Sequence, residues 1–267
     1  MKCFFVLFFL LQVVSAHAID VYIVAGQSNG WNLSKLRANP KKRDNLSHKV
    51  YYYGMNCVSE PDQSTFKVFD NLDENYGGFG LAKTCLDKSG KDIVFIQFCR
   101  CGSPIHEANQ RMTWYPGEDP KNGKTFNEGL YDLFLVYLEH AKEELKNKYQ
   151  LEWNLKGLFW HQGESESESN SEDSIKSYPK NLRNLIYRFR SDLGDDLNIV
   201  SAHIRELDHL DPQVNQVLND YSKEDSKFTV VESNDLSFRP DKNGRKDVHF
   251  NEEGAIELGK RMGRALK

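Results

Sequence analysis

The sequence has 267 residues, of which 39% are hydrophobic and 28% charged, and it contains 18 glycines and 8 prolines. This composition excludes collagen-like, low-complexity and wholly disordered chains, and the length suits a single domain with a full core. The net charge of -4 provides no basic field to hold phosphates, so we expect no nucleic-acid partner.

The first 18 residues, MKCFFVLFFLLQVVSAHA, have the pattern of a secretory signal peptide. Lys2 precedes an apolar run over residues 3–11, and a small-x-small cleavage site ends at Ala18. The run is too short to span a bilayer, and no long apolar run follows residue 14, so we expect no membrane span. The chain is therefore predicted to be secreted to the extracellular space, with a signal peptide at 1–18 and one domain at 19–267.

Strand-like and helix-like segments alternate along the rest of the chain. A short β-rich run at 20–25 ends at Gly26 and is followed by a polar, turn-rich loop at 31–48. The next elements are a weaker strand candidate at 50–53, a helix at 79–88, a buried strand at 92–98 and an irregular stretch at 100–126. Apolar spacing then predicts a long helix from Leu130 to about Tyr149, a strand at 156–160, a helix over 182–193, a strand at 197–203, a helix at 212–222, a strand at 228–231 and a closing helix at 252–266.

This alternation is typical of parallel βαβ units. It predicts an α/β fold, a three-layer α/β/α sandwich with a mostly parallel sheet of about five strands. No repeat or linker divides the chain. Ligands of such sheets bind beyond the carboxyl ends of the strands, so the chemistry is expected just after strands.

Secretion would place the cysteines in an oxidising route. Cys3 would leave with the signal peptide, and the remaining four, Cys57, Cys85, Cys99 and Cys101, allow two disulfides. Cys99 and Cys101 are too close in sequence to pair without strain, so we expect Cys57 and Cys85 each to pair with one of them. Histidines at zinc-ligand spacing are absent from the sequence, and we expect no metal and no cofactor.

Two asparagines, Asn32 and Asn45, begin Asn-Leu-Ser sequons for N-glycosylation. The sequons have a meaning only in a secreted chain, which they would make a glycoprotein. The sequence does not distinguish which of them carries a glycan.

The first polar segment after a strand is Gly26-Gln27-Ser28-Asn29-Gly30. A serine at a glycine-flanked turn from strand to helix lies at the edge of the sheet, with its own N–H directed at any oxyanion formed there. Ser28 is therefore a candidate nucleophile. Serine and asparagine also favour helix caps and turns for structural reasons, so the segment alone leaves both interpretations open.

The second segment, His161-Gln162-Gly163-Glu164, follows the strand at 156–160. The neutral amide of Gln162 suits the polarisation of a carbonyl, and Glu164 is a candidate to orient an imidazole. The alternative is a polar loop in which His161 is structural. Glu166 and Glu168, which come next, are interpreted as a solvated stretch.

The third segment, Asp247-Val248-His249, precedes the closing helix. A histidine with an adjacent acid can be the base that activates Ser28. The alternative is an N-terminal cap region, in which Asn251 caps the helix and His249 has no chemical role.

Together the segments resemble the SGNH hydrolase superfamily, a flavodoxin-like fold, and within it the carbohydrate esterases of the sialate O-acetylesterase and acetyl xylan esterase type (carbohydrate esterase family 6). IVAGQSN at 23–29 looks like the first block of that family, and FCRCGSPI at 98–105 resembles its second. FWHQGES at 159–165 is similar to the WxQGE block, and DVHFNEEG at 247–254 to the block of the catalytic histidine.

The resemblance implies a secreted serine esterase that removes O-acetyl groups from carbohydrate, either sialic acid or an acetylated polysaccharide. It implies a catalytic pair of Ser28 and His249, and an oxyanion hole formed by the Ser28 N–H, the Gly102 N–H and the Gln162 side chain. Trp31, Trp114 and Tyr115 lie in predicted loops and are candidates to stack on the sugar.

The chain departs from the family pattern at three positions. The usual acid stands three residues before the histidine, where this chain has Lys246, and Asp247 stands two before it. Either Asp247 or Glu164 then orients His249, or the site is a dyad. Gly30 replaces the usual methionine, and Cys101 replaces a glycine of the second block. The shifted aspartate is the one feature that favours a different class, a carbohydrate-binding or scaffold protein with a degenerate hydrolase site.

Overall fold

The structure is a computed structural model that describes residues 17–35, 50–54, 70–71, 79–107, 113–117, 129–168, 172–207, 210, 212–240 and 247–267. Most of the predicted signal peptide, Cys57, the sequon at Asn45 and Lys246 lie outside the described residues. Among the described helices, none is long and apolar enough to cross a membrane.

The described strands form one sheet of seven strands in the order β3-β2-β4-β1-β5-β6-β7. Neighbouring strands pair in parallel except β2 and β3, which pair antiparallel. The predicted class is confirmed, and the sheet is wider than expected because the weak candidate at 50–53 is a strand and a two-residue strand pairs with it. The strands are β1 (His17–Gly26), β2 (Val50–Gly54), β3 (Asp70–Asn71), β4 (Ile93–Cys99), β5 (Leu151–His161), β6 (Ile199–Ala202) and β7 (Phe228–Val231).

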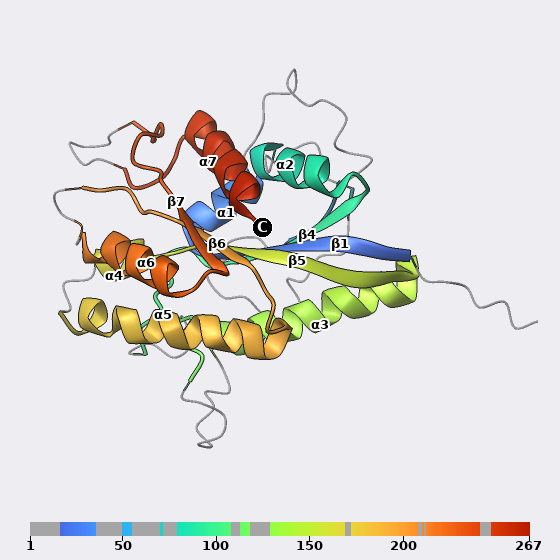
Figure 1. Ribbon diagram of the computed structural model, residues 1–267, viewed down its shortest axis with the longest axis horizontal. Coiled ribbons are helices and arrows are strands. Elements are labelled where there is room, and N and C mark those ends of the chain that lie inside the picture. Colours follow the sequence, from blue (N-terminus) through green and yellow to red (C-terminus); the bar gives the residue numbers. More distant parts are fainter. Residues whose placement is uncertain are drawn as a thin grey trace, which may run out of the picture.

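Helices cover both faces of the sheet (Figure 1). One layer contains α1 (Ser28–Lys35), α2 (Phe79–Ser89) and α7 (Glu252–Ala265), and the other contains α3 (Leu130–Tyr149), α5 (Glu172–Leu193) and α6 (Gln213–Glu224). A short helix, α4 (Glu164–Ser167), follows β5 directly. The three layers match the sandwich that the sequence predicts.

Strand β1 shows why both faces of the sheet need a cover. Val21 and Ile23 are fully buried in the core beneath α3 and α5, whereas Tyr22 and Val24 are buried in the core beneath α2 and α7. Because alternate residues of a strand point to opposite faces, a strand buried on both faces is apolar at successive positions. Each such aliphatic side chain contributes about 1.5–3 kcal/mol by burial.

The centre of the sheet brings three loops together. Gly26, the last residue of β1, is paired with Cys99 at the end of β4 and with His161 at the end of β5. The chain continues to β2 and β4 on one side of β1 and to β5, β6 and β7 on the other, so β1 lies at the topological switch point. The segments after β1, β4 and β5 therefore begin side by side.

Gly26 allows the close approach of these segments. It has a φ of +126°, and a Cβ added there would lie 2.1 Å from the backbone oxygen of His161. Only glycine adopts this conformation without strain, and no side chain fits the space. The glycine that ends β1 is thus required by the contact with β5.

The prediction that Cys85 forms a disulfide is wrong. Cys85 and Cys99 are free thiols, fully buried in the apolar core beneath α2 and α7, so the disulfide predicted between Cys85 and Cys99 or Cys101 is absent. Burial raises the pKa of both thiols, which makes them unreactive. Cys101 is disulfide-bonded.

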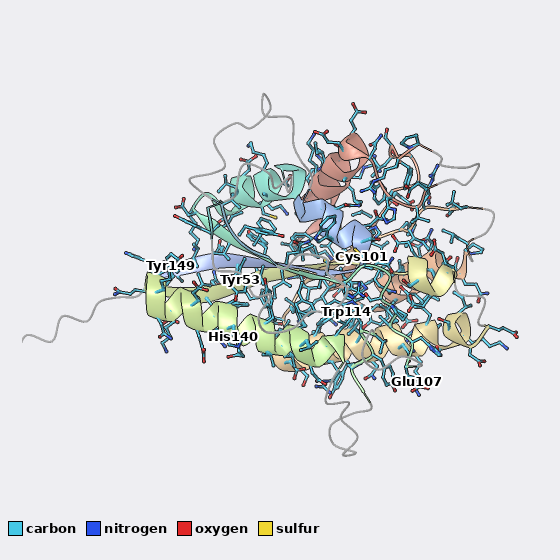
Figure 2. The ribbon with its side chains drawn as sticks, turned by 180° about the vertical axis from the view of Figure 1, so that it is seen from behind. Tyr53, Cys101, Glu107, Trp114, His140 and Tyr149 are labelled. Carbon is cyan, nitrogen blue, oxygen red and sulfur yellow. The ribbon has the colours of Figure 1, made fainter. Side chains whose placement is uncertain are left out.

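The aromatic candidates for sugar stacking also lie elsewhere than predicted. Trp114 is fully buried and packs with its ring centroid 5.1 Å from that of Trp160 and 5.6 Å from that of Phe98. Figure 2 shows Trp114 between the sheet and the helices behind it. Tyr115 is buried as well, and Trp31 packs partly buried against the opposite core. These rings contribute to the packing of the fold.

Candidate active site

Ser28 is the first residue of α1 and directly follows the turn that ends β1. The first N–H groups of a helix have no partner inside the helix, and the helix dipole favours negative charge there. The backbone N–H of Ser28 therefore belongs to a region suited to an oxyanion. Ser28 is a buried residue that retains 9% exposure.

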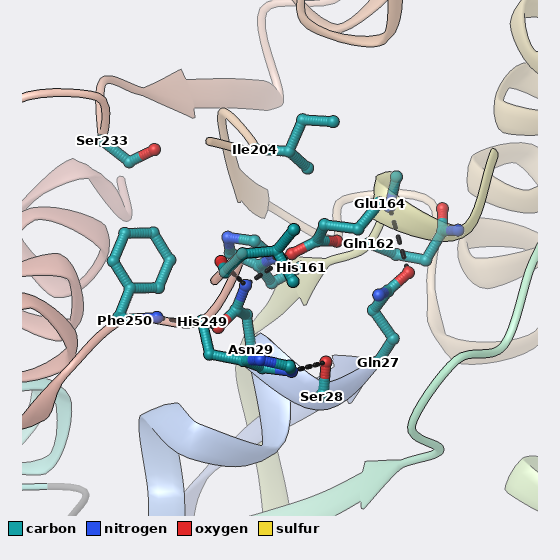
Figure 3. Close-up of polar contacts among 12 residues, drawn as sticks. Gln27, Ser28, Asn29, His161, Gln162, Glu164, Ile204, Ser233, His249 and Phe250 are labelled. Atoms are coloured by element: carbon teal, nitrogen blue, oxygen red, sulfur yellow. Dashed lines mark hydrogen bonds and ion pairs between the residues drawn. The ribbon is translucent and has the colours of Figure 1, made fainter. Parts of the chain in front are cut away.

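His249 lies against Ser28, although 221 residues separate them in the sequence (Figure 3). The Nε2 atom of His249 is 2.9 Å from Ser28 Oγ, and its Nδ1 atom is 2.6 Å from Asp247 Oδ1. A carboxylate accepts only, so Nδ1–H donates to Asp247 and Nε2 is left to accept the hydroxyl proton of Ser28. The three residues have the geometry of a serine hydrolase triad.

Asp247 is held as a carboxylate in this arrangement. Burial raises the pKa of Asp247, but hydrogen bonds from the backbone N–H and the ring of His249 lower it more, and the pKa ends below its ordinary value. The backbone hydrogen bond is 2.9 Å long. Arg205 donates to the backbone oxygen of Asp247 and so fixes the loop from the other side. Asp247 therefore reaches the ring of His249 although it stands two residues before the histidine and not three, because the chain folds so that residues 247 and 249 contact each other.

Glu164, the other candidate to orient His249, contacts a different residue. Its Oε1 accepts a hydrogen bond of 2.6 Å from Asn29 Nδ2 and lies 3.6 Å from His161 Nδ1. Asn29 Nδ2 also donates to the backbone oxygen of Val248 at 3.1 Å, and its Oδ1 accepts from the Phe250 N–H at 3.3 Å. Glu164 therefore positions Asn29, and Asn29 holds the backbone on either side of His249.

Sequence reasoning did not assign a role to Asn29. The only signal available was its place next to Ser28, where an asparagine is also a common turn residue. His161, beside it, is fully buried, and neither ring nitrogen makes a hydrogen bond within the described part of the chain. Burial lowers the pKa of His161, which keeps the ring neutral. His161 is therefore a packing residue whose ring meets Phe250 edge-on, with 5.8 Å between the ring centroids.

Gly102 lies in the exposed turn after β4. The N–H of Arg100 donates to the Gly26 oxygen at 3.0 Å, which ties the start of this loop to the end of β1. Gly102 has a φ of +66°, a left-handed conformation that favours glycine and turns the loop back on itself. The structure thus places the predicted oxyanion glycine on a loop anchored beside the Ser28 turn.

Gln162 differs from its expected role. It is fully buried, and its Nε2 donates to the Ser103 oxygen at 3.3 Å and to the carboxylate of Glu166. Both amide hydrogens are therefore used inside the protein, and the geometry does not present Gln162 to an oxyanion at Ser28. Glu166 is also fully buried, so the interpretation of a solvated stretch is wrong for this residue. The reason is that α4 turns the chain inward directly after β5.

Arg205, which donates to the backbone oxygen of Asp247, lines a cavity of about 500 Å³. Its walls are mixed, with Ile204, Leu207, Leu210 and Pro212 as the apolar members and Arg205, Glu206 and Asn215 as the polar members. Arg205 connects the cavity to the triad through its hydrogen bond to Asp247.

A family model shows the family of this chain, and solved structures show its fold. The family model described as carbohydrate esterase, sialic acid-specific acetylesterase, matches residues 18–267. A protein from Arabidopsis thaliana is 17% identical, with a TM-score of 0.62 over 93% of this chain and 98% of that chain. NanS is 15% identical, with a TM-score of 0.65 over 95% of this chain and 98% of that chain. A carbohydrate acetylesterase from Xanthomonas citri is 15% identical, with a TM-score of 0.60 over 92% of this chain and 55% of that chain. The comparison with curated proteins gives no match.

Proposed function

The chain belongs to the carbohydrate esterases of the sialic acid-specific acetylesterase family, which are carboxylic ester hydrolases, and we propose that it removes O-acetyl groups from carbohydrate through an acetyl intermediate on Ser28. The observation that carries this proposal is the chain of hydrogen bonds from Ser28 through His249 to Asp247, with distances of 2.9 and 2.6 Å. The degenerate-site alternative loses its support, because the shifted aspartate contacts the histidine.

The first half of the reaction forms the acetyl-enzyme. Ser28 Oγ attacks the acetyl carbonyl carbon while His249 Nε2 takes the hydroxyl proton, and a tetrahedral oxyanion results. The carboxylate of Asp247 stabilises the imidazolium that forms. The intermediate collapses when the bond from the acetyl carbon to the sugar oxygen breaks, and His249 returns its proton to that oxygen.

The second half releases acetate. His249 takes a proton from water, the hydroxide attacks the acetyl carbon, and the bond to Ser28 Oγ breaks as the proton returns to the serine. Both tetrahedral intermediates carry their charge on the former carbonyl oxygen. The N–H groups of Ser28 and Gly102 are the donors proposed for it, and one such donor is typically worth about 3 kcal/mol.

Acetate release from a panel of acetylated sialosides and acetylated xylan tests the substrate class. We expect mass spectrometry to show sugars that have lost acetyl groups but keep their glycosidic bonds, because Ser28 attacks the ester carbonyl. Aryl esters of long-chain acids are the comparison, and we expect them to be poorer substrates than aryl acetate. Hydrolysis of long-chain esters without release of acetate from any sugar would contradict the proposal.

The proposal includes secretion of a single domain over residues 19–267. It is supported by the burial pattern of β1, where His17 and Ala18 are exposed and the buried part begins at Ile19, directly after the proposed cleavage site. Expression through a secretory pathway is expected to yield a chain that begins at Ile19, as measured by intact mass. A secreted chain that still carries residues 1–18 would argue against cleavage there.

The two sequons are not equivalent in this proposal. Asn32 is only 3% exposed within α1, and a glycan does not fit there in the folded chain. Asn45 lies outside the described residues. A glycan, if the chain carries one at these sequons, therefore belongs at Asn45.

A further inference from the structure

Glu166 is a fully buried carboxylate that the triad does not use. Its Oε1 accepts from the N–H of Ile105, and its Oε2 accepts from Gln162 Nε2. Gln162 in turn donates to the Ser103 oxygen at 3.3 Å. Glu166 and Gln162 together thus hold residues 103 and 105, which stand one and three positions after Gly102.

The charge of Glu166 is costly at this place. The pKa of Glu166 is raised to about 7, mainly by burial and in part by the charge of Glu164, while the hydrogen bonds from Ile105 and Gln162 oppose the rise. The ionisable group that faces it from α5 is Tyr178, whose own pKa is raised by burial, so that side chain stays neutral.

We propose that Glu166 is a positioning residue for the oxyanion loop. By accepting from Ile105 and Gln162, the carboxylate holds the turn after β4 so that the N–H of Gly102 faces the acetyl oxygen. This inference rests on the proposed function, because Gly102 has an oxyanion to bind only if Ser28 attacks an ester. Small displacements of such a donor lower the rate, since the donor has to meet the oxygen where its charge develops.

Other contacts hold the same loop and limit the expected effect. Ser103 Oγ donates to the Arg100 oxygen at 2.6 Å and accepts from Trp114 Nε1 at 3.0 Å. The loop is therefore anchored on one side by the core and on the other side by Glu166. Loss of the second anchor is expected to displace the loop without unfolding it.

Glu166→Gln is the variant that tests the role. Glutamine has the same shape, but its NH2 group has to face one of the two donors, so only one hydrogen bond is kept. We expect kcat for aryl acetate hydrolysis to fall about tenfold or more, with KM changed less than about twofold, because ground-state binding does not use the oxyanion donor. The matched control is Glu168→Gln, which removes the same charge from an exposed position on the same stretch.

The pH dependence separates positioning from a purely structural role. Protonation of Glu166 below about pH 7 removes one hydrogen-bond acceptor, as the Glu166→Gln substitution does. The ratio of the wild-type kcat to the E166Q kcat is therefore expected to fall toward one as the pH is lowered from 8.5 to 6. A kcat of E166Q within twofold of that of E168Q, or a ratio that is constant with pH, would overturn the inference.

A third variant keeps the test valid if E166Q does not fold. Glu166→Asp keeps the charge but withdraws the carboxylate from the loop, and the same loss of kcat at constant KM is expected. An unchanged kcat in E166D would count against the inference. Failure of the proposed function itself looks different, because the wild type would then release no acetate or Ser28→Ala would be as active as the wild type.

Discussion

Replacement of Ser28 by alanine is expected to lower kcat for acetate release by about 10⁴- to 10⁶-fold, the range found when the nucleophile of a serine hydrolase is removed. The physical reason is that Ser28 Oγ is the atom at hydrogen-bond distance from His249 Nε2, at 2.9 Å, and alanine has no group to attack the ester. The activity that remains comes from water and the oxyanion donors. Release of p-nitrophenol from its acetate, together with acetate determined separately, measures the effect.

The fold provides the control for this variant. Ser28 is not one of the apolar residues that form the core beneath α2 and α7, so we expect the thermal unfolding midpoint of S28A to stay within a few degrees of the wild type. A burst of p-nitrophenol equal to the enzyme concentration is expected from the wild type if deacetylation is slower than acetylation, and none from S28A. An S28A protein that folds and keeps more than a tenth of the activity would rule out Ser28 as the nucleophile.

Asp247→Asn is the variant with the second largest expected effect, a fall in kcat of about 10⁴-fold. The amide cannot hold a charge opposite the imidazolium, and its NH2 group favours the tautomer in which Nε2 carries the hydrogen. In that tautomer His249 cannot accept the proton of Ser28, so both roles of the histidine are lost. Steady-state kinetics from pH 6 to 9 measure the effect, since no pH in that range restores the tautomer.

Glu164→Gln is the matched control, because it makes the same change at the other acid that was a candidate to orient His249. The amide oxygen of glutamine can still accept from Asn29 Nδ2, so we expect E164Q to lose at most about tenfold in kcat. If the two variants exchanged places, with E164Q inactive and D247N active, the assignment of Asp247 would be wrong. A large loss in both would show that Asn29 and its hold on the His249 loop matter as much as the triad.

Much of the architecture is determined locally, and the sequence predicted that part correctly. The alternation of apolar strands with amphipathic helices defines a parallel sheet between two helical layers, because burial on one or both faces sets the period of the apolar residues. The rule that chemistry follows the carboxyl ends of strands placed Ser28 among the candidates, and the acid beside it before the closing helix placed His249 there. The two side chains meet at 2.9 Å. The width of the sheet was underestimated, since β2 and β3 have only five and two residues and leave a weak pattern.

The partners of buried polar groups were beyond the reach of such patterns. The sequence left Asp247 and Glu164 as equal candidates to orient His249, assigned the amide of Gln162 to an oxyanion, placed Glu166 in solvent and paired Cys85 in a disulfide. Each of these depends on which side chain lies opposite a donor or acceptor from another element, and neither composition nor periodicity records that distance. The fold resolves them because Gly26 allows the ends of β1, β4 and β5 to lie together. Glu164 then contacts Asn29, and Gln162 and Glu166 contact the loop after β4. Asp247 is the acid that contacts His249.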